Sequence, residues 1–302
     1  MIRKRTILSL ALLATTAACG GGGGGAAGPA PAAASGGAAP ASGVSTNFNN
    51  PSVVASTDAK GNVGTPTMAA DQTSQTATMT VGDTGETITI NVPGMGVNHT
   101  FNTSANQLAL DGTVKFNGAD VFSGGGAQVA MYKDGNGGVL VSDNSGKLSF
   151  SNYGIWANGD SDLGQKVTAV GAFATGAETL ATDLPTTGTA TYQGSAVATG
   201  TSGGQNTNWA GTFTGGVDFA ARTATVGVNM VSSTDQSALN LSSGPMSMTG
   251  PRFSGAIAGS GVSGSTAGAL YGPAANEMAG VFSASGAGTT VLGAYGGAQT
   301  PH

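Results

Sequence analysis

Residues that could carry acid–base or metal chemistry are few and widely spaced in this chain. Its 302 residues include only two histidines, His99 and the terminal His302, and 8% are charged, against roughly 25% in ordinary soluble proteins. A histidine triad or a two-histidine metal site is hard to assemble from one interior histidine. The carboxylates stand singly, without the paired spacing of general acid–base catalysis. We therefore expect a protein that is not an enzyme, with no metal and no cofactor.

Two glycine-rich segments have the outline of ligand loops. Asp134-Gly135-Asn136-Gly137 has the first residues of a calcium loop but lacks the full ligand run and the distal Glu. Gly259, Gly261 and Gly264 have the spacing of a dinucleotide fingerprint, but the residues that follow indicate a strand and not a helix. Both segments are predicted to be hairpin turns.

The single cysteine, Cys19, closes a segment that is typical of exported proteins. Arg3-Lys4-Arg5 precedes an apolar run at 7–14 and the small residues Thr16-Ala17-Ala18, which is the order of a secretory signal peptide. Thr16-Ala17-Ala18-Cys19 resembles the bacterial lipobox, although Thr16 stands where leucine is usual. The resemblance implies cleavage after residue 18 and lipidation of Cys19. An ordinary secretory signal with an incidental cysteine is the alternative.

Lipid at Cys19 would anchor the chain to a membrane without spanning it. The apolar run is shorter than the roughly 20 residues of a transmembrane helix, whereas each buried acyl methylene contributes about 0.8 kcal/mol, so two or three chains hold firmly. Gly20 replaces the Asp that commonly retains lipoproteins at the inner membrane, which favours the outer membrane. Residues 19–48, rich in Gly, Ala and Pro, predict a flexible tether.

Charge excludes one class of partner. Removal of Arg3, Lys4 and Arg5 from the ten basic residues leaves seven against 15 acidic residues. No basic stripe remains, so we expect no nucleic-acid binding.

From residue 50 onward the pattern is that of short strands separated by Gly, Ser and Asn turns. The first block predicts strands at 76–80, 86–92 and 127–133, a hairpin of 138–142 with 146–152 around Asp143-Asn144-Ser145, and an aromatic edge at Tyr153-Gly154-Ile155-Trp156. The second block predicts strands at 188–198, 208–214, 216–219, 222–231, 237–241, 246–249, 252–258, 265–270, 278–284 and 290–295. Regular short strands favour a barrel or sandwich.

The second block resembles the C-terminal barrel of the transferrin-binding protein B family, which factor H binding protein shares. The resemblance starts at Leu184-Pro185 and runs to about residue 298; its most specific stretch is 268–282, with the sequence GALYGPAANEMAGVF. The resemblance implies a structural role for the matching residues, with a role at an interface as the alternative: Tyr192, Gly194, Asp218, Phe219, Tyr271, Gly272, Pro273, Glu277, Gly280 and Phe282. Residues 50 to 180 resemble the family's N-terminal handle only loosely.

The Tyr-Gly-Pro-Ala-Ala-Asn-Glu element has a simple structural interpretation. Pro273 fixes the entry of a turn, Asn276 tolerates left-handed angles, and Glu277 can cap nearby amides. Tyr271 is expected in the core or at the rim of the barrel, with ligation of haem iron as the less favoured alternative.

The fold expected is all-β: an antiparallel handle-like sheet domain, then an eight-stranded antiparallel barrel. The segments are a signal peptide at 1–18, the tether at 19–48, the handle at 49–180 and the barrel at 181–302. The resemblance implies an outer-membrane surface lipoprotein that binds a host protein or an iron or haem carrier, with a possible TonB-dependent receptor as partner. A structural or adhesive envelope lipoprotein is the alternative; an integral porin is weaker, because the chain ends in Pro301-His302 and not in an aromatic strand end.

Overall fold

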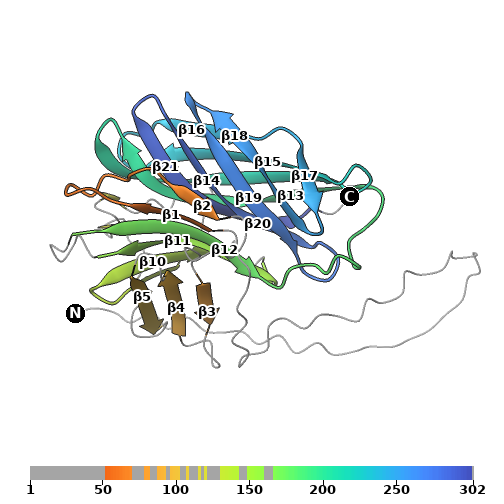
Figure 1. The fold of residues 1–302 in the computed structure, drawn as a ribbon, viewed down its shortest axis with the longest axis horizontal. Coiled ribbons are helices and arrows are strands. Elements are labelled where there is room, and N and C mark those ends of the chain that lie inside the picture. Colours follow the sequence, from red (N-terminus) through yellow and green to blue (C-terminus); the bar gives the residue numbers. More distant parts are fainter. Residues whose placement is uncertain are drawn as a thin grey trace, which may run out of the picture. The chain divides into compact units, whose positions relative to one another are not determined.

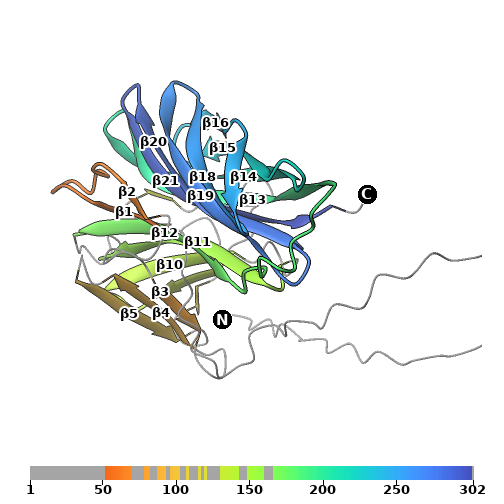
Figure 2. The same cartoon turned by 45° about the vertical axis from the view of Figure 1, so that its right-hand side comes forward.

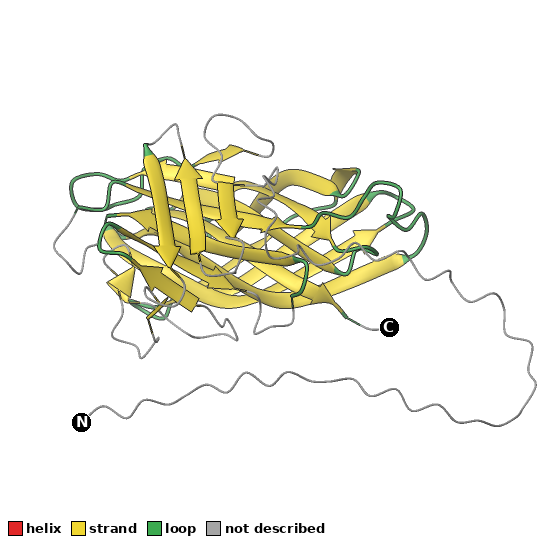
Figure 3. Cartoon of the chain, turned by 90° about the horizontal axis from the view of Figure 1, so that it is seen from below, coloured by secondary structure: helices red, strands yellow, loops and turns green. Residues whose placement is uncertain are grey.

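The computed structural model describes residues 52–69, 78–81, 87–92, 96–102, 107–108, 115–116, 119–120, 130–142, 148–159 and 166–300. Within these residues every regular element is a strand (Figure 3). The expected all-β fold class is therefore confirmed. None of the described residues belongs to a helix long and apolar enough to cross a membrane. Cys19 and the predicted tether lie outside the described residues.

The C-terminal strands form a closed antiparallel barrel (Figure 1). The strands are β13 (Thr189–Ser202), β14 (Gln205–Asp218), β15 (Thr223–Ser232), β16 (Ala238–Ser242), β17 (Met246–Thr249), β18 (Arg252–Gly259), β19 (Val262–Tyr271), β20 (Glu277–Gly286) and β21 (Thr289–Gln299). β16 and β17 both pair with β15, one after the other along its length, so the nine strands occupy eight positions around the barrel. Pairing of β14 with β15 closes the sheet. The predicted strands 208–214 and 216–219 are one continuous strand, β14.

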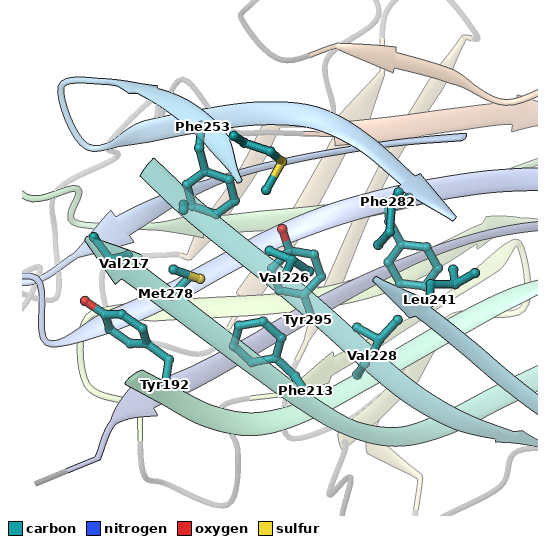
Figure 4. Close-up of a cluster of buried hydrophobic side chains, with 14 of the residues drawn as sticks. Tyr192, Phe213, Val217, Val226, Val228, Leu241, Phe253, Met278, Phe282 and Tyr295 are labelled. Carbon is teal, nitrogen blue, oxygen red and sulfur yellow. The ribbon is translucent and has the colours of Figure 1, made fainter. Parts of the chain in front are cut away.

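Alternation along the barrel strands decides which side chains fill its interior. On β14, Phe213 and Val217 are buried in the barrel core, whereas Thr212 and Thr214 are exposed. The interior is packed with aromatic, aliphatic and methionine side chains (Figure 4). In it the rings of Phe213 and Tyr295 stack with centroids 4.7 Å apart. The barrel is therefore a filled core in its middle layers.

A second antiparallel sheet, sheet A, packs against part of the barrel wall (Figure 2). Its order is β2-β1-β12-β11-β10-β9-β6. The strands are β1 (Ser52–Ser56), β2 (Thr67–Ala69), β6 (Gln107–Leu108), β9 (Ala130–Lys133), β10 (Gly137–Ser142), β11 (Ser151–Asn158) and β12 (Ala169–Gly176). Ile155 and Ala172 of sheet A share one apolar cluster with Val281 and Leu292 of the barrel. β20 is consequently buried on both faces over most of its length, whereas β15 alternates between buried and exposed residues.

The other face of sheet A carries a smaller layer. β3 (Thr78–Val81), β4 (Thr87–Val92) and β5 (Val97–Asn102) form a three-stranded sheet. Ile90 and Phe101 of this sheet cluster with Trp156 and Phe173 of sheet A. β7 (Lys115–Phe116) and β8 (Ala119–Asp120) form a short separate pair, and Asn208 of the barrel donates to the carbonyls of Phe116 and Ala119.

Glycines opposite aromatic residues let the layers pack closely. Trp156 faces Gly171 and Phe173 faces Gly154 in sheet A, and in the barrel Phe253 faces Gly268, Phe282 faces Gly293 and Tyr295 faces Gly280. A Cβ at Gly293 would lie 2.6 Å from the ring of Phe282, and one at Gly268 would lie 2.5 Å from the ring of Phe253. In each of these pairs the ring occupies the space that a side chain at the glycine would need, which explains why glycine stands at these five positions.

Two details of the sequence interpretation are wrong. Residues 138–142 belong to β10, which pairs with residues 153–158 of β11 and not with 146–152, so the tight hairpin predicted there does not form. Tyr153-Gly154-Ile155-Trp156 is not an edge, because β11 lies between β10 and β12 and these residues are buried. The alternation of Leu148 and Phe150 imitates a strand, but Ser149 and Phe150 form bends that precede β11.

Candidate functional site

The turn between β19 and β20 joins the barrel to the chain that enters it. Gly272 has a φ of +84°, and its N–H donates to the carbonyl of Ala177 at 2.8 Å. Asn276 does not take the left-handed conformation expected of it: Ala275 does, with a φ of 57°, and the Asn276 side-chain oxygen accepts from the N–H of Ala274 at 3.2 Å. Pro273 lies half-buried at the entry of this turn.

Glu277 begins β20 and links the barrel to sheet A. Its side chain is 3% exposed. One carboxylate oxygen accepts from the N–H of Ser149 at 2.6 Å, the other accepts from the hydroxyl of Ser151 at 2.7 Å, and the N–H of Phe150 is 3.2 Å from both. A second polar link joins the hydroxyls of Tyr153 and Ser195. The carboxylate thus caps amides of a segment more than a hundred residues away, not those of its own turn.

Tyr271 ends β19 beneath sheet A, in the apolar cluster shared by the two layers. It is 0% exposed, its hydroxyl has no hydrogen-bond partner, and burial, followed by the nearby Glu178 carboxylate, raises its pKa well above the usual value. Beside it, the Arg252 guanidinium donates to both oxygens of Glu178, at 2.7 and 2.9 Å. Tyr271 is therefore enclosed between layers and does not face the interior or the rim of the barrel.

The other barrel residues singled out from the sequence lie in the barrel interior or at the end of the barrel where β14 finishes. Tyr192 and Phe282 fill the core, and the Tyr192 hydroxyl donates to the carbonyl of Ala275 at 2.8 Å. Gly194 on β13 pairs with Phe213, and Gly280 lies against the Tyr295 hydroxyl. Asp218 accepts from the N–H of Ala221 at 2.9 Å at the end of β14, and the N–H of Phe219 donates to Gly188. The structure brings Tyr271, Gly272, Pro273 and Glu277 together at the junction with sheet A; Asp218 and Phe219 lie in another turn.

At the opposite end, the barrel opens in a polar cup. On β13, β14 and β15 the inward-facing side chains are apolar in the core, where they include Ala198, Trp209 and Met230. Toward this end of the barrel they become polar, at Ser202, Thr207 and Ser232. A cavity of about 280 Å³ lies there, lined by Ser202, Gln205, Thr207, Ser232, Thr234 and Asp235 together with Gly203. We call this cavity the cup. Sequence reasoning missed it, because polar residues at strand ends look like turn residues; the available signal was their place in the inward-facing series.

Hydrogen bonds preorganise one side of the cup. The Ser232 hydroxyl lies 2.9 Å from that of Thr207 and accepts from the N–H groups of Thr234 and Asp235 at 3.2 and 3.3 Å. Asp235 accepts from the hydroxyl of Ser237 at 2.7 Å. Hydrogen bonds from Ser232 and Ser237 lower the pKa of Asp235 to about 2. The cup therefore holds one carboxylate that is ionised throughout the physiological range.

The interior histidine lies elsewhere, between sheet A and the three-stranded sheet. His99 Nε2 is 2.7 Å from the side-chain oxygen of Asn158, and Nδ1 is 3.7 Å from Asp134. Asp134 also accepts from the N–H of Asn136, within the turn that joins β9 and β10. In the described part of the chain, no three His, Cys, Asp or Glu side chains gather closely enough to hold a metal ion.

These features define a class: an all-β chain with a closed eight-stranded barrel and an antiparallel sheet packed on its wall. Residues 184–299 match the family model described as the C-lobe and N-lobe beta barrels of Tf-binding protein B. The matched residues contain nearly all of the barrel, and they are the part of the chain for which the sequence resemblance implied this family. No curated protein sequence matches the chain significantly.

Solved structures similar to this chain include a transferrin-binding protein and a haemoglobin receptor. Transferrin-binding protein B from Haemophilus parasuis Hp5 is 16% identical, with 75% of this chain and 51% of that chain covered and a TM-score of 0.45. The haemoglobin receptor HpuA from Kingella denitrificans is 14% identical, with 87% of this chain and 91% of that chain covered and a TM-score of 0.44. The chain thus spans about half the length of the Haemophilus parasuis protein.

Proposed function

We propose that the chain is a lipoprotein, anchored to the outer membrane through Cys19, whose sheet and barrel bind a host protein that carries iron or haem. The observation that carries this proposal is the match of residues 184–299 to the barrels of Tf-binding protein B. Binding, and not catalysis, is the activity proposed. A TonB-dependent receptor that accepts the iron or haem is the proposed second partner.

The geometry supports this role in physical terms. The Glu277 carboxylate and the apolar cluster between Ile155 and Val281 hold sheet A on the barrel wall. Loops on a rigid support lose less conformational entropy when they bind than loops on separate mobile layers. We also propose that the chain is divided into a tether at 19–48, a sheet domain at 49–180 and a barrel at 181–302, with 177–188 as the connection.

A panel of host carriers tests the binding proposal. The full chain in detergent is immobilised and titrated with transferrin, lactoferrin, haemoglobin and free haem. We expect micromolar or tighter binding of one of the proteins, with no binding after the immobilised chain is unfolded in urea. Absence of binding to all of them would contradict the proposal.

The lipid anchor is tested separately. Cys19→Ala removes the acceptor for the acyl chains, so we expect the variant to leave the membrane fraction while the unaltered chain stays in it. Mass spectrometry of the N-terminal peptide checks the cause. An unmodified thiol on the membrane-bound chain would show that Cys19 is not the anchor.

One observation favours the alternative, a structural or adhesive envelope lipoprotein. The exposed side chains on the outer face of the barrel, away from sheet A, include Thr212, Thr225, Asn229, Asn240 and Ser254. Such a face offers few of the aromatic and Arg anchors on which tight protein interfaces depend. Binding of the chain to whole cells or matrix, without binding to any carrier, would favour this alternative.

A further inference from the structure

At the cup, the side chains that face the barrel interior are polar and not apolar. On three neighbouring strands the inward-facing series changes from apolar to polar at the same end: Ala198 gives way to Ser202, Trp209 to Thr207, and Met230 to Ser232. Thr207 and Ser232 are 2% and 1% exposed. Their hydroxyls form the polar floor of the cup, although an apolar layer would close the barrel without the free-energy cost of burying polar groups.

The chemistry of the cup selects the kind of group that fits it. Every side chain in its lining is a hydroxyl, an amide or a carboxylate, with Gly203 adding none. No hydrocarbon side chain lines the cup, so an apolar ligand would leave its polar groups without partners, and an anion would face the Asp235 carboxylate. A guanidinium carries five N–H donors and an ammonium three, neither with an acceptor. Such a cation can donate to the hydroxyls of Ser202 and Thr234 while its charge is balanced by Asp235.

The volume of the cup and its exposure to solvent further limit the ligands that can bind there. At about 280 Å³ the cup lies at the lower limit of small-molecule pockets, and it is large enough for the end of one long side chain. Gly203, Gln205, Thr234 and Asp235 at its rim are exposed. The cup lies at the end of the barrel where the hairpins 202–205 and 286–289 turn, so a large partner can reach it.

We propose that the cup receives the guanidinium or ammonium group of an Arg or Lys side chain, which a partner protein inserts into the mouth of the barrel. The proposal rests on the proposed function, because the partner is taken to be a protein. Asp235 supplies the charge, and the hydroxyls around it supply the remaining acceptors.

Small cations test the site without any assumption about the partner. The full chain is titrated with ethylguanidinium or n-butylammonium, and amide shifts are followed by NMR; ethylurea and propionate are the uncharged and anionic controls. We expect shifts confined to residues 202–207 and 232–237, with a millimolar dissociation constant that weakens as salt rises. Equal shifts with ethylurea, or shifts spread over the whole barrel, would overturn the proposal.

A matched pair of variants assigns the charge. Asp235→Asn should weaken ethylguanidinium binding about three- to tenfold, the range of an exposed charge-assisted pair. Asp183→Asn removes an exposed carboxylate from the connection at the other end of the barrel and should change nothing. The same affinity in both variants would overturn the role of Asp235.

The same variants separate this proposal from the proposed function. A carrier protein that binds as well after Asp235→Asn as before would overturn the inserted side chain and leave the proposed function intact. Binding of ethylguanidinium at the cup, with no carrier bound, would contradict the proposed function and support the cation site.

Discussion

Glu277 allows the attachment of sheet A to the barrel to be measured. Glu277→Ala removes a buried acceptor that serves Ser149, Phe150 and Ser151. A hydrogen bond to a charged group contributes about 1.5–3 kcal/mol, and the loss of such a bond at a buried donor costs that donor's desolvation. Two effects reduce the loss: the N–H of Ser149, an exposed residue, can hydrogen-bond to water instead, and folding no longer has to desolvate the carboxylate. We therefore expect a loss of about 3 kcal/mol in the free energy of unfolding.

Glu277→Gln keeps one side-chain oxygen as an acceptor, so its loss should be about half as large, roughly 1.5 kcal/mol. Glu178→Gln is the matched control. Its ion pair with Arg252 is partly exposed, with side chains 21% and 29% accessible, so it should cost less than about 1 kcal/mol.

The two tryptophans make the assay specific to the layers, since Trp156 lies in sheet A and Trp209 in the barrel core. Urea unfolding of the full chain is followed by fluorescence in the Trp156→Phe and Trp209→Phe backgrounds. The two transitions should coincide with Glu277 present, and the Trp156 signal should change at lower urea in Glu277→Ala. A loss below about 0.5 kcal/mol in Glu277→Ala, or transitions that still coincide, would refute this account of the link.

Three further outcomes are expected. Gly280→Ala should cost about 1–3 kcal/mol in urea unfolding, because its Cβ would lie 2.5 Å from the carbonyl oxygen of Ala267 and against the Tyr295 hydroxyl; Gly244→Ala, with nothing within 4 Å, should be near neutral. Burial raises the pKa of Tyr192 and Tyr295, so the folded state favours their neutral forms. Their stabilisation is complete below about pH 10 and is lost above it. Tyrosinate absorbance from these residues should therefore rise together with the loss of near-UV circular dichroism; ionisation at pH 10 in a folded chain would contradict this. Because the pKa of Asp235 is lowered from 3.8 to about 2, its contribution to stability is present above about pH 4 and falls toward pH 2. Ethylguanidinium binding should accordingly stay constant from pH 8 to pH 4, and a decline near pH 6 would point to another group.

The barrel could be predicted strand by strand because its outer face is partly open to water. β15 and β16 alternate between buried and exposed residues and end at turns, which is the signal that period-two reasoning detects. β12 and β20 are buried on both faces over most or all of their length, so their burial leaves less alternation to detect. No strand was predicted over β12, and the strand predicted at 278–284, within β20, depended on flanking turns and on the family resemblance.

The contacts of the site were harder to predict, for two separate reasons. Glu277 meets Ser149 and Ser151 across 126 to 128 residues, and such a distant pairing leaves no local pattern. The acidic residue was expected to cap its own turn because only that turn was visible in the sequence. The cup was missed because Ser232 and Asp235 look like ordinary turn residues until the strands are placed side by side.

The composition of the chain also bears on where a partner can bind. A ring that lies over a cross-strand glycine, as Phe282 does over Gly293, fills the interior with one large side chain where two medium ones would otherwise pack. Small residues in the strands also let sheet A approach the wall, as Tyr153 does at Gly296. The exposed outer face of the barrel likewise carries short uncharged side chains, such as Thr225 and Ser254. A wall of this kind provides little binding energy. Specific affinity must then come from loops, or from a site such as the cup, where Asp235 places the negative charge within a preorganised set of acceptors.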